Sequence, residues 1–197
     1  MNGNYFANAI IFLISTLFGL YIFATLLRFL FGLVRADFYN PLSAALVKIS
    51  NPLLLPLRRF IPGYRGFDWA ALILLVALKF LEITLVGLMM GQTYRITGTL
   101  VWAIAELLAL TLNVFIFSII IEAMMSWFNP GSNPLTHLLY RLNYPLLNPT
   151  RRRLPPMSGF DLSPFVVIIV LQLFSLLIVA PILDFGRSLA TGLSIIL

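Results

Sequence analysis

The stretch "NPLLLPLRRFIPGYRGFD" runs from Asn51 to Asp68, and a close variant, "YPLLNPTRRRLPPMSGFD", runs from Tyr144 to Asp161. Both begin with closely spaced prolines, continue with paired arginines and end in Gly-Phe-Asp before a long apolar run. They align without a gap at an offset of 93 positions, which is 161 minus 68. The chain is therefore predicted to contain two copies of one structural unit.

The composition is typical of an integral membrane protein. Of the 197 residues, 60% are apolar and 10% are charged, whereas a soluble domain carries about 25% charged residues. Apolar runs at 9–27, 72–90, 100–128 and 165–183 are each about long enough to cross a hydrocarbon core of ~30 Å as a helix. The N-terminus lacks the basic residues of a cleavable signal peptide. We predict an all-α membrane protein with four transmembrane helices.

Each copy is predicted to be a helical hairpin with two spans. The first copy covers residues 1–97, with spans at about 9–33 and 69–91. The second covers residues 98–197, with spans at about 100–128 and 163–183. Because each copy holds an even number of spans, the two hairpins are expected to be parallel, related by an axis along the membrane normal.

Basic residues gather between the two spans of each copy. Lys and Arg in short loops mark the cytoplasmic side of a membrane. Both connecting segments are therefore predicted to be cytoplasmic, with both termini on the opposite side. Nine of the 13 Lys and Arg residues lie in these segments: Arg35, Lys48, Arg58, Arg59, Arg65, Arg141, Arg151, Arg152 and Arg153.

The connecting segments have readable local signals. Asn40 and Asn133 each precede a proline, which predicts a helix N-cap followed by Pro at the first helical position. Apolar residues at helical spacing over 42–49 and leucines over 135–142 then predict a short amphipathic helix lying in the membrane interface. Further prolines are predicted to prevent a continuous helix. Residues 51–68 and 144–161 are therefore expected to form a Pro/Arg-rich elbow of irregular backbone.

The polar residues of the elbows allow two interpretations each. Asp68 and Asp161 directly precede a span, where they would cap the helix N-terminus, or they could be ion ligands. The arginines could anchor the topology above the headgroups, or they could recognise anionic lipid phosphates or an acidic cytosolic protein. The arginines in question are Arg58, Arg59, Arg151 and Arg152.

Five charges fall inside the predicted spans, where an ionisable group costs about 2.5–3.5 kcal/mol on insertion scales. Arg28 and Glu122 occupy equivalent positions with opposite charge, so we predict that they pair and join the two hairpins. Lys79 and Glu82 can pair along one helix, and Glu106 could meet Lys79. Either these charges are ion pairs that hold a helical bundle, or some of them line a cation path.

The pattern Asn-Pro, then Pro-Leu-Leu-x-Pro-x-Arg-Arg-x-Ile-Pro, then Asp before the next span resembles the YggT family of bacterial membrane proteins. The second copy departs from the first by having Glu122 in place of Arg28. The resemblance implies a multi-pass protein of the bacterial inner membrane, with both termini periplasmic. It also implies a role in osmotic-stress tolerance and ion homeostasis, with K⁺ as one candidate ion, or in some lineages a role in cell division.

No enzyme signature is visible. His137 is the single histidine, cysteine is absent, and no metal-binding, P-loop or Rossmann motif occurs. We expect neither an enzymatic activity, a cofactor or metal, nor nucleic-acid binding. Two functions remain open.

The first candidate function is an ion-homeostasis protein, acting as a homo-oligomer because four helices seldom enclose a pore, and it should depend on Glu82 and Glu106. The second is a membrane scaffold for cell division or envelope organisation, whose elbows dock anionic lipid or a cytosolic protein. That function should depend on the elbow arginines.

Overall fold

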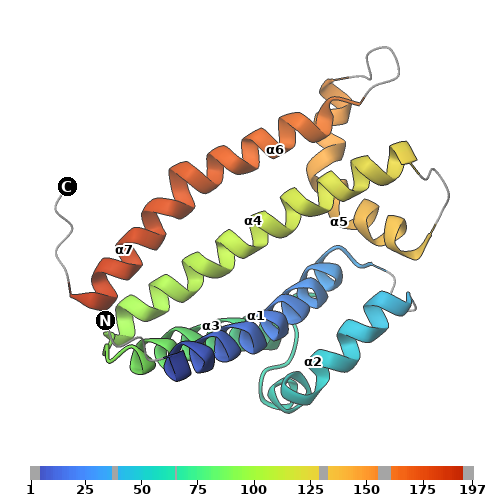
Figure 1. The fold of residues 1–197 in the computed structure, drawn as a ribbon. Coiled ribbons are helices and arrows are strands. Elements are labelled where there is room, and N and C mark those ends of the chain that lie inside the picture. The colour runs from blue at the N-terminus through green and yellow to red at the C-terminus, as the bar shows by residue number, and fades with distance from the viewer. Residues whose placement is uncertain (1–4, 37–39, 65, 129–132, 155–160, 193–197) are drawn as a thin grey trace.

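The computed structural model of the chain describes residues 5–36, 40–64, 66–128, 133–154 and 161–192 (Figure 1). The regular structure of these residues is helical, and they contain no β-strand. The helices are α1 (Tyr5–Leu33), α2 (Pro41–Phe60), α3 (Trp69–Met89), α4 (Ile96–Phe128), α5 (Pro134–Arg153), α6 (Ser163–Phe174) and α7 (Ala180–Thr191), with a π-helical turn at Ser175–Val179 between the last two.

Four helices are long and apolar enough to cross a membrane, which agrees with the predicted multi-pass membrane protein. They are Tyr5–Leu33, Trp69–Met89, Ile96–Ser126 and the continuous run Ser163–Thr191. The last run continues past the end of its apolar stretch at 183 and includes Arg187. This extension places a charged side chain where the apolar pattern had predicted none.

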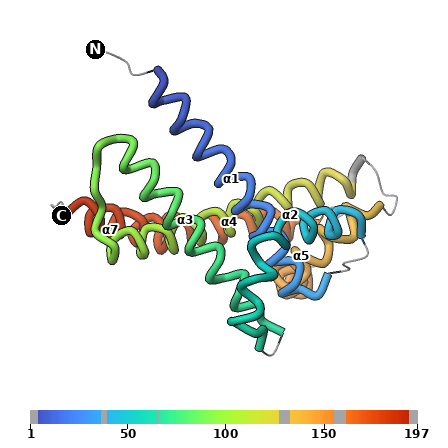
Figure 2. The backbone as a smooth tube through the Cα atoms, turned by 90° about the horizontal axis from the view of Figure 1, so that it is seen from below, coloured from blue at the N-terminus to red at the C-terminus, as the bar shows by residue number. Residues whose placement is uncertain are grey.

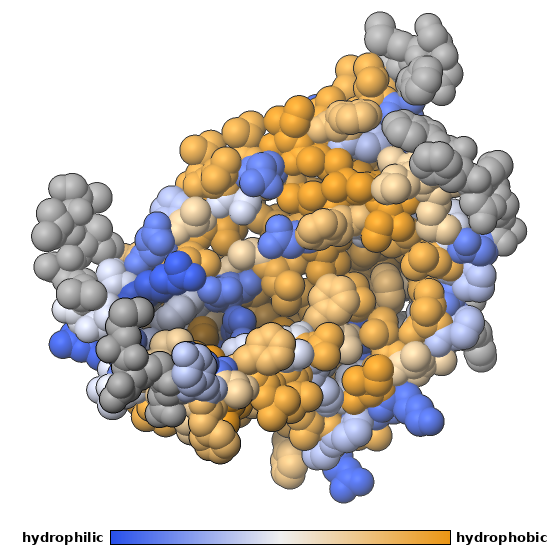
Figure 3. Space-filling model, viewed as in Figure 1, coloured by the Kyte–Doolittle hydropathy of each residue, from blue (hydrophilic) through white to orange (hydrophobic). Residues whose placement is uncertain are grey.

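The helices run between two ends of the molecule. Figure 1 shows the start of α1 and the end of α7 at one end, which we call the terminal end, and α2 and α5 at the other, the elbow end. The tube in Figure 2 gives the same separation from a second direction. α4 contacts α3, α5, α6 and α7, so it joins the two copies. Figure 3 shows a broad apolar surface over the middle of this face, with hydrophilic residues mainly toward its ends.

α4 and α7 cross at backbone contact near the terminal end. A Cβ atom added to Gly98 would lie 2.1 Å from the Ala190 nitrogen, and one added to Gly186 would lie 2.6 Å from the Trp102 nitrogen. The Arg95 N–H also donates to the Ala190 carbonyl at 2.9 Å. Small residues of this kind allow close helix packing in membranes, where the hydrophobic effect does not drive helices together.

At the elbow end, one pair of equivalent leucines from the two connecting helices is completely buried. Leu54 of α2 joins an apolar cluster that includes Ile22, Leu75 and Leu138, and it is 0% exposed. Leu147, its equivalent in α5, joins a smaller cluster with residues of α4 and α6 and is 1% exposed. Burying a leucine side chain contributes about 1.5–3 kcal/mol, so this burial helps to hold each connecting helix against the rest of the molecule.

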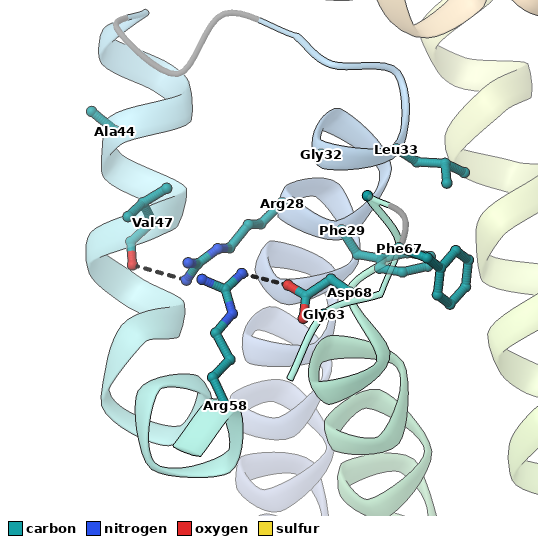
Figure 4. Close-up of a pocket in the computed structure, with 11 residues that line it drawn as sticks. Arg28, Phe29, Gly32, Leu33, Ala44, Val47, Arg58, Gly63, Phe67 and Asp68 are labelled. Carbon is teal, nitrogen blue, oxygen red and sulfur yellow. Dashed lines mark hydrogen bonds and ion pairs between the residues drawn. The ribbon is translucent and has the colours of Figure 1, made fainter. Parts of the chain in front are cut away.

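The prediction of an irregular backbone beyond the first elbow proline was wrong. α2 continues through Pro52 and Pro56, and α5 continues through Pro145 and Pro149. The two prolines of each helix are four residues apart and exposed, so the carbonyls that lose an N–H partner lie on one outward face. The helix bends there instead of ending, and Figure 4 shows the part of α2 that carries Arg58 turned away from the preceding turns.

Candidate functional site

The two predicted N-caps are confirmed. Asn40 Oδ1 accepts a hydrogen bond from the Leu42 N–H at 3.0 Å, and Asn133 Oδ1 accepts one from the Thr136 N–H at 2.9 Å. In each helix a proline, which has no N–H to satisfy, occupies the first position. These caps fix where each connecting helix begins.

Asn40 has a second role that its equivalent does not share. Its Nδ2 donates to the Pro134 carbonyl at 2.7 Å, which joins the start of α2 to the start of α5. The side-chain oxygen of Asn133 instead also accepts from the Thr136 hydroxyl at 3.0 Å. One amide therefore caps its own helix and links the two copies. The sequence carries no signal for this link, because both caps are the same residue type.

Each elbow is closed by an ion pair between its first arginine and the aspartate before the next span, which we call the Arg–Asp clasp. In the first copy Arg58 Nη2 pairs with Asp68 Oδ2. In the second copy Arg151 Nε lies 2.7 Å from Asp161 Oδ2. The four residues are equivalent at the offset of 93, as 58 plus 93 is 151 and 68 plus 93 is 161.

Asp68 is the N-cap of α3, as predicted, whereas Asp161 lies one residue before Leu162, the N-cap of α6, and still accepts from an N–H of the first turn. Asp68 Oδ1 accepts from the Ala71 N–H at 3.2 Å, and Asp161 Oδ1 accepts from the Ser163 N–H at 2.9 Å. Each carboxylate thus uses one oxygen for a helix start and the other for the clasp. The sequence predicted the contact with the helix start, but it carried no local signal for the partner arginine, which lies ten residues earlier.

The clasp of the second copy stabilises both charges. Burial alone would lower the pKa of Arg151, but its hydrogen bond to Asp161 and the charges of Asp161 and Glu122 outweigh burial and raise that pKa. Burial would likewise raise the pKa of Asp161, whereas hydrogen bonds from Arg151 and Ser163 lower it below its usual value. Asp161 therefore remains ionised across the physiological pH range.

The second arginine of each pair is placed differently from the first. Arg59 and Arg152 are exposed, and no ion pair or hydrogen bond within the described part of the chain includes them. Lys48 of α2 and its equivalent Arg141 of α5 are exposed as well. The elbow arginines therefore separate into an inner residue that closes the elbow and an outer residue that is available to a ligand or headgroup.

Arg28 is buried, with 7% of its surface exposed, and it bonds to the connecting helix of its own copy. Its Nη1 donates to Ser50 Oγ at 2.6 Å, to Asn51 Oδ1 at 2.8 Å and to the Val47 carbonyl at 3.4 Å. None of the ion pairs among the described residues includes it. The predicted Arg28–Glu122 pair was therefore wrong.

Glu122 also bonds within its own copy. Its Oε2 accepts from Asn143 Nδ2 at 2.8 Å, and its Oε1 lies 3.4 Å from Arg151 Nη2. Asn143 is completely buried and accepts in turn from the Ser118 hydroxyl at 2.6 Å. The charge near the elbow end of each first span thus holds the connecting helix that follows it. The equal depth of their positions had suggested that the two charges join the copies, and they do not.

The remaining charges within the spans also have partners, one along the same helix and one on another helix. Lys79 Nζ lies 3.0 Å from Glu82 Oε2, which confirms that predicted pair. The suggested contact of Glu106 with Lys79 was wrong, because Glu106 Oε1 lies 3.1 Å from Trp102 Nε1 and 3.3 Å from Arg187 Nη2. Arg187 comes within reach because the final helix continues beyond the apolar run.

A pocket adjoins the clasp in each copy. The first has a volume of about 780 Å³ and is lined by Arg28, Arg58 and Asp68, with apolar walls from Phe29 and Phe67 among others (Figure 4). The second has a volume of about 510 Å³, and its charged lining consists of Glu122, Arg151 and Asp161. Each pocket lies where the first span, the connecting helix and the clasp of one copy meet.

Comparison with known proteins identifies the family. The CCB3/YggT family model matches two tandem segments, residues 7–89 and 101–182. An uncharacterized protein of Pseudomonas aeruginosa is 43% identical over 176 residues, which cover 87% of this chain and 88% of that protein.

The uncharacterized protein YggT of Escherichia coli K12 is 34% identical over 188 residues, 94% of this chain and 97% of that protein. No solved structure matches the chain. The match of the family model to both segments, together with these relatives, confirms the resemblance seen in the elbow motif, and the chain belongs to the CCB3/YggT family.

Proposed function

We propose that the chain is a non-enzymatic scaffold of the bacterial inner membrane that holds anionic lipid headgroups at its elbow end. The observation that carries this proposal is that the two arginines of each pair have different contacts. Arg58 and Arg151 close the elbows through ion pairs, whereas Arg59 and Arg152 are exposed and have no ion-pair or hydrogen-bond partner among the described residues. An arginine that is not needed for the fold and lies beside a lipid-facing helix is suited to a phosphate group.

The distribution of charge supports an orientation with the elbow end in the cytoplasm. α2 and α5, which lie together at that end (Figure 1), carry six exposed basic residues, whereas Arg95 and Arg187 are exposed near the terminal end. The six are Lys48, Arg58, Arg59, Arg141, Arg152 and Arg153. The cytoplasmic leaflet carries anionic lipid, and each nearby Lys or Arg contributes about 1 kcal/mol of attraction. In this orientation both termini are periplasmic.

Exposed apolar side chains on the connecting helices support a position in the membrane interface. Leu53 and Leu55 of α2 are about half exposed, and Phe60 at its end is 85% exposed. Apolar groups beside exposed cations are typical of helices that lie in the headgroup region. The backbone carbonyls freed by the prolines would also find water at that depth.

The proposal is tested by the lipid preference of the protein in proteoliposomes. Electron paramagnetic resonance of spin-labelled lipids should show a preference for phosphatidylglycerol over phosphatidylcholine at the protein surface. The double variant Arg59→Gln/Arg152→Gln should lose a large part of that preference. Raising the ionic strength should weaken it in the wild type, because salt screens exposed charges.

A matched control separates charge from other effects of substitution. Arg59→Lys/Arg152→Lys keeps both charges and should keep most of the preference. An equal preference in wild type and the Gln double variant, with both shown to be folded, would refute this role for the outer arginines. Retention of an acidic cytosolic protein by the same arginines, without lipid preference, would assign the scaffold a protein ligand instead.

The role in osmotic-stress tolerance or K⁺ homeostasis that the resemblance implies stays a prediction. The contacts sharpen its test, because Glu82 is paired with Lys79, and Glu106 is bound by Trp102 and Arg187. A cation path through these carboxylates would have to compete with these partners. Flux of K⁺ into proteoliposomes that the double variant Glu82→Gln/Glu106→Gln abolishes would establish transport.

A further inference from the structure

Each copy has a hydrogen bond between a charged residue of its first span and a polar residue of its connecting helix, and donor and acceptor are exchanged between the copies. Arg28 and Glu122 are equivalent at an offset of 94, because the first spans align one residue apart from the elbows, and Ser50 and Asn143 are equivalent at 93. Arg28 donates to the Ser50 hydroxyl, whereas Glu122 accepts from the Asn143 amide. The neighbour has thus changed together with the charge.

This reversal leaves the two pockets with opposite charge balances. In the second copy, Arg151 lies between two carboxylates, those of Asp161 and Glu122. In the first copy, Asp68 is paired with Arg58, and the described partners of Arg28 are neutral oxygens. The described lining of the first pocket therefore carries two guanidinium groups and one carboxylate.

Arg28 retains donors for a further ligand. A guanidinium has five N–H donors, and all of the hydrogen bonds that Arg28 makes to described residues come from Nη1. Figure 4 shows its head group beside that of Arg58, with both at the pocket. Two neighbouring cations, one of them largely withdrawn from water, are stabilised when an anion accepts hydrogen bonds from both.

We propose that the first-copy pocket, between Arg28 and Arg58, binds a phosphate group, specifically that of an anionic phospholipid, and that the second-copy pocket does not. The second copy shows how such an anion is accommodated, because the Glu122 carboxylate meets Arg151, the equivalent of Arg58. A phosphate oxygen in the first copy would take the place of that carboxylate. The proposal rests on the proposed function for its lipid source.

The walls of the pocket favour a lipid over free phosphate. Phe29, Leu33 and Phe67 line it beside the arginines, so an apolar surface adjoins the cationic one. A volume of about 780 Å³ is within the range of about 300–1,000 Å³ that is typical of ligand pockets. Inorganic phosphate would use the arginines and gain nothing from the apolar wall.

Native mass spectrometry of the full chain released from nanodiscs tests the proposal. In nanodiscs of phosphatidylcholine with a minor share of phosphatidylglycerol, the wild type should retain one phosphatidylglycerol with saturable affinity. Arg28→Gln should weaken this retention about tenfold or more, as expected for the loss of a charged hydrogen-bond donor. Arg95→Gln, which removes an exposed arginine at the terminal end, should leave it unchanged.

A second variant controls for loss of retention through misfolding. Arg28→Glu/Ser50→Asn gives the first copy the residues of the second, so Glu at position 28 should pair with Arg58 and the protein should unfold at a temperature close to that of the wild type. It should nevertheless retain no phosphatidylglycerol. Equal retention of the two lipids by the wild type, or unchanged retention in both Arg28 variants, would overturn the proposal.

Inorganic phosphate separates the two sources of the ligand. Titrated into nanodiscs of phosphatidylcholine alone, it should bind weakly. Arg28-dependent binding of inorganic phosphate in these nanodiscs, together with no retention of phosphatidylglycerol in the mixed nanodiscs, would overturn the lipid assignment. Failure of this proposal can also be told apart from failure of the proposed scaffold function. General lipid preference at the surface should follow Arg59 and Arg152, whereas the single retained lipid should follow Arg28.

Discussion

At the scale of single residues, the same side chain has different consequences in the two copies. Asn40 and Asn133 both cap a helix, but only the amide of Asn40 also donates across to Pro134. The capping contact needs an acceptor alone, and the link between the copies needs a donor. An aspartate provides the first and lacks the second, so it distinguishes the two roles.

The variant Asn40→Asp should destabilise the protein by about 0.5–1.5 kcal/mol, the usual net contribution of one hydrogen bond. The matched control Asn133→Asp keeps both of its acceptor contacts with Thr136 and should be neutral or slightly stabilising at a helix N-terminus. Denaturant unfolding in mixed micelles measures both. Equal effects of the two substitutions would show that the cross-copy bond contributes nothing.

The clasp of the second copy should be insensitive to pH between about 5 and 8. Because the pKa of Asp161 is lowered in the folded protein, its stabilisation is complete above the unfolded value of about 3.9 and is lost as the pH falls through the lower folded value. A spin label on Leu162→Cys, unique in a chain without cysteine, should keep its mobility over this range.

The same label should become mobile at every pH in an Arg151→Gln background, because the partner of the carboxylate is removed. This variant provides the control for label position. A transition of the wild type near pH 6 would contradict the assignment of Asp161 as the ionised member of the pair.

At the scale of elements, the crossing of α4 and α7 depends on the absence of a side chain. Gly98→Ala would place a Cβ 2.1 Å from a backbone nitrogen of α7, and a backbone atom cannot move aside as a side chain can. The helices would have to separate, at a cost of about 1–3 kcal/mol. The free energy of unfolding in mixed micelles should fall by this amount.

Gly19→Ala is the matched control for that substitution. Gly19 lies inside α1, and a Cβ added there would have no heavy atom within 4 Å. The change should be neutral or stabilising, because alanine favours a helix more than glycine does. A similar loss of stability in both variants would mean that the crossing is not the cause.

The elements also show how far local sequence signals reach. The apolar runs predicted the spans, and Asn-Pro predicted the helix starts, because both are local effects of hydropathy and capping. The prolines led to a wrong prediction, since Pro52 and Pro56 lie on an exposed face of α2 and bend the helix without ending it. The apolar pattern ends at residue 183, before the helix does, so it gave no indication that Arg187 would pair with Glu106.

The Arg–Asp clasps and the reversed polarity of the Arg28 and Glu122 contacts could not be predicted from the sequence for a different reason. The sequence singles out both Arg58 and Asp68, but their pairing depends on the tertiary path of the chain between them. Arg28 and Glu122 were recognised as equivalents, and opposite charge suggested that they pair. Each instead found a partner in its own connecting helix, because Ser50 and Asn143 had the matching acceptor and donor.

At the scale of the whole molecule, the orientation has a direct test in whole cells. The chain has no cysteine, so single exposed substitutions report their side without background. Phe60→Cys and Tyr140→Cys at the elbow end should react with a membrane-impermeant maleimide only after the cells are opened. Gln92→Cys, between α3 and α4, should react in intact cells, and the reverse pattern would place the elbows in the periplasm.

Across the whole molecule, we infer that two copies of one unit have become unequal, one closed by its own carboxylate and the other left open for an anion. The most direct measurement is an experimental structure of the protein in a bilayer containing phosphatidylglycerol. We predict phosphate density between Arg28 and Arg58, and none between Glu122 and Arg151. An Arg28 side chain turned to a protein carboxylate, with the first pocket empty of lipid, would contradict the account.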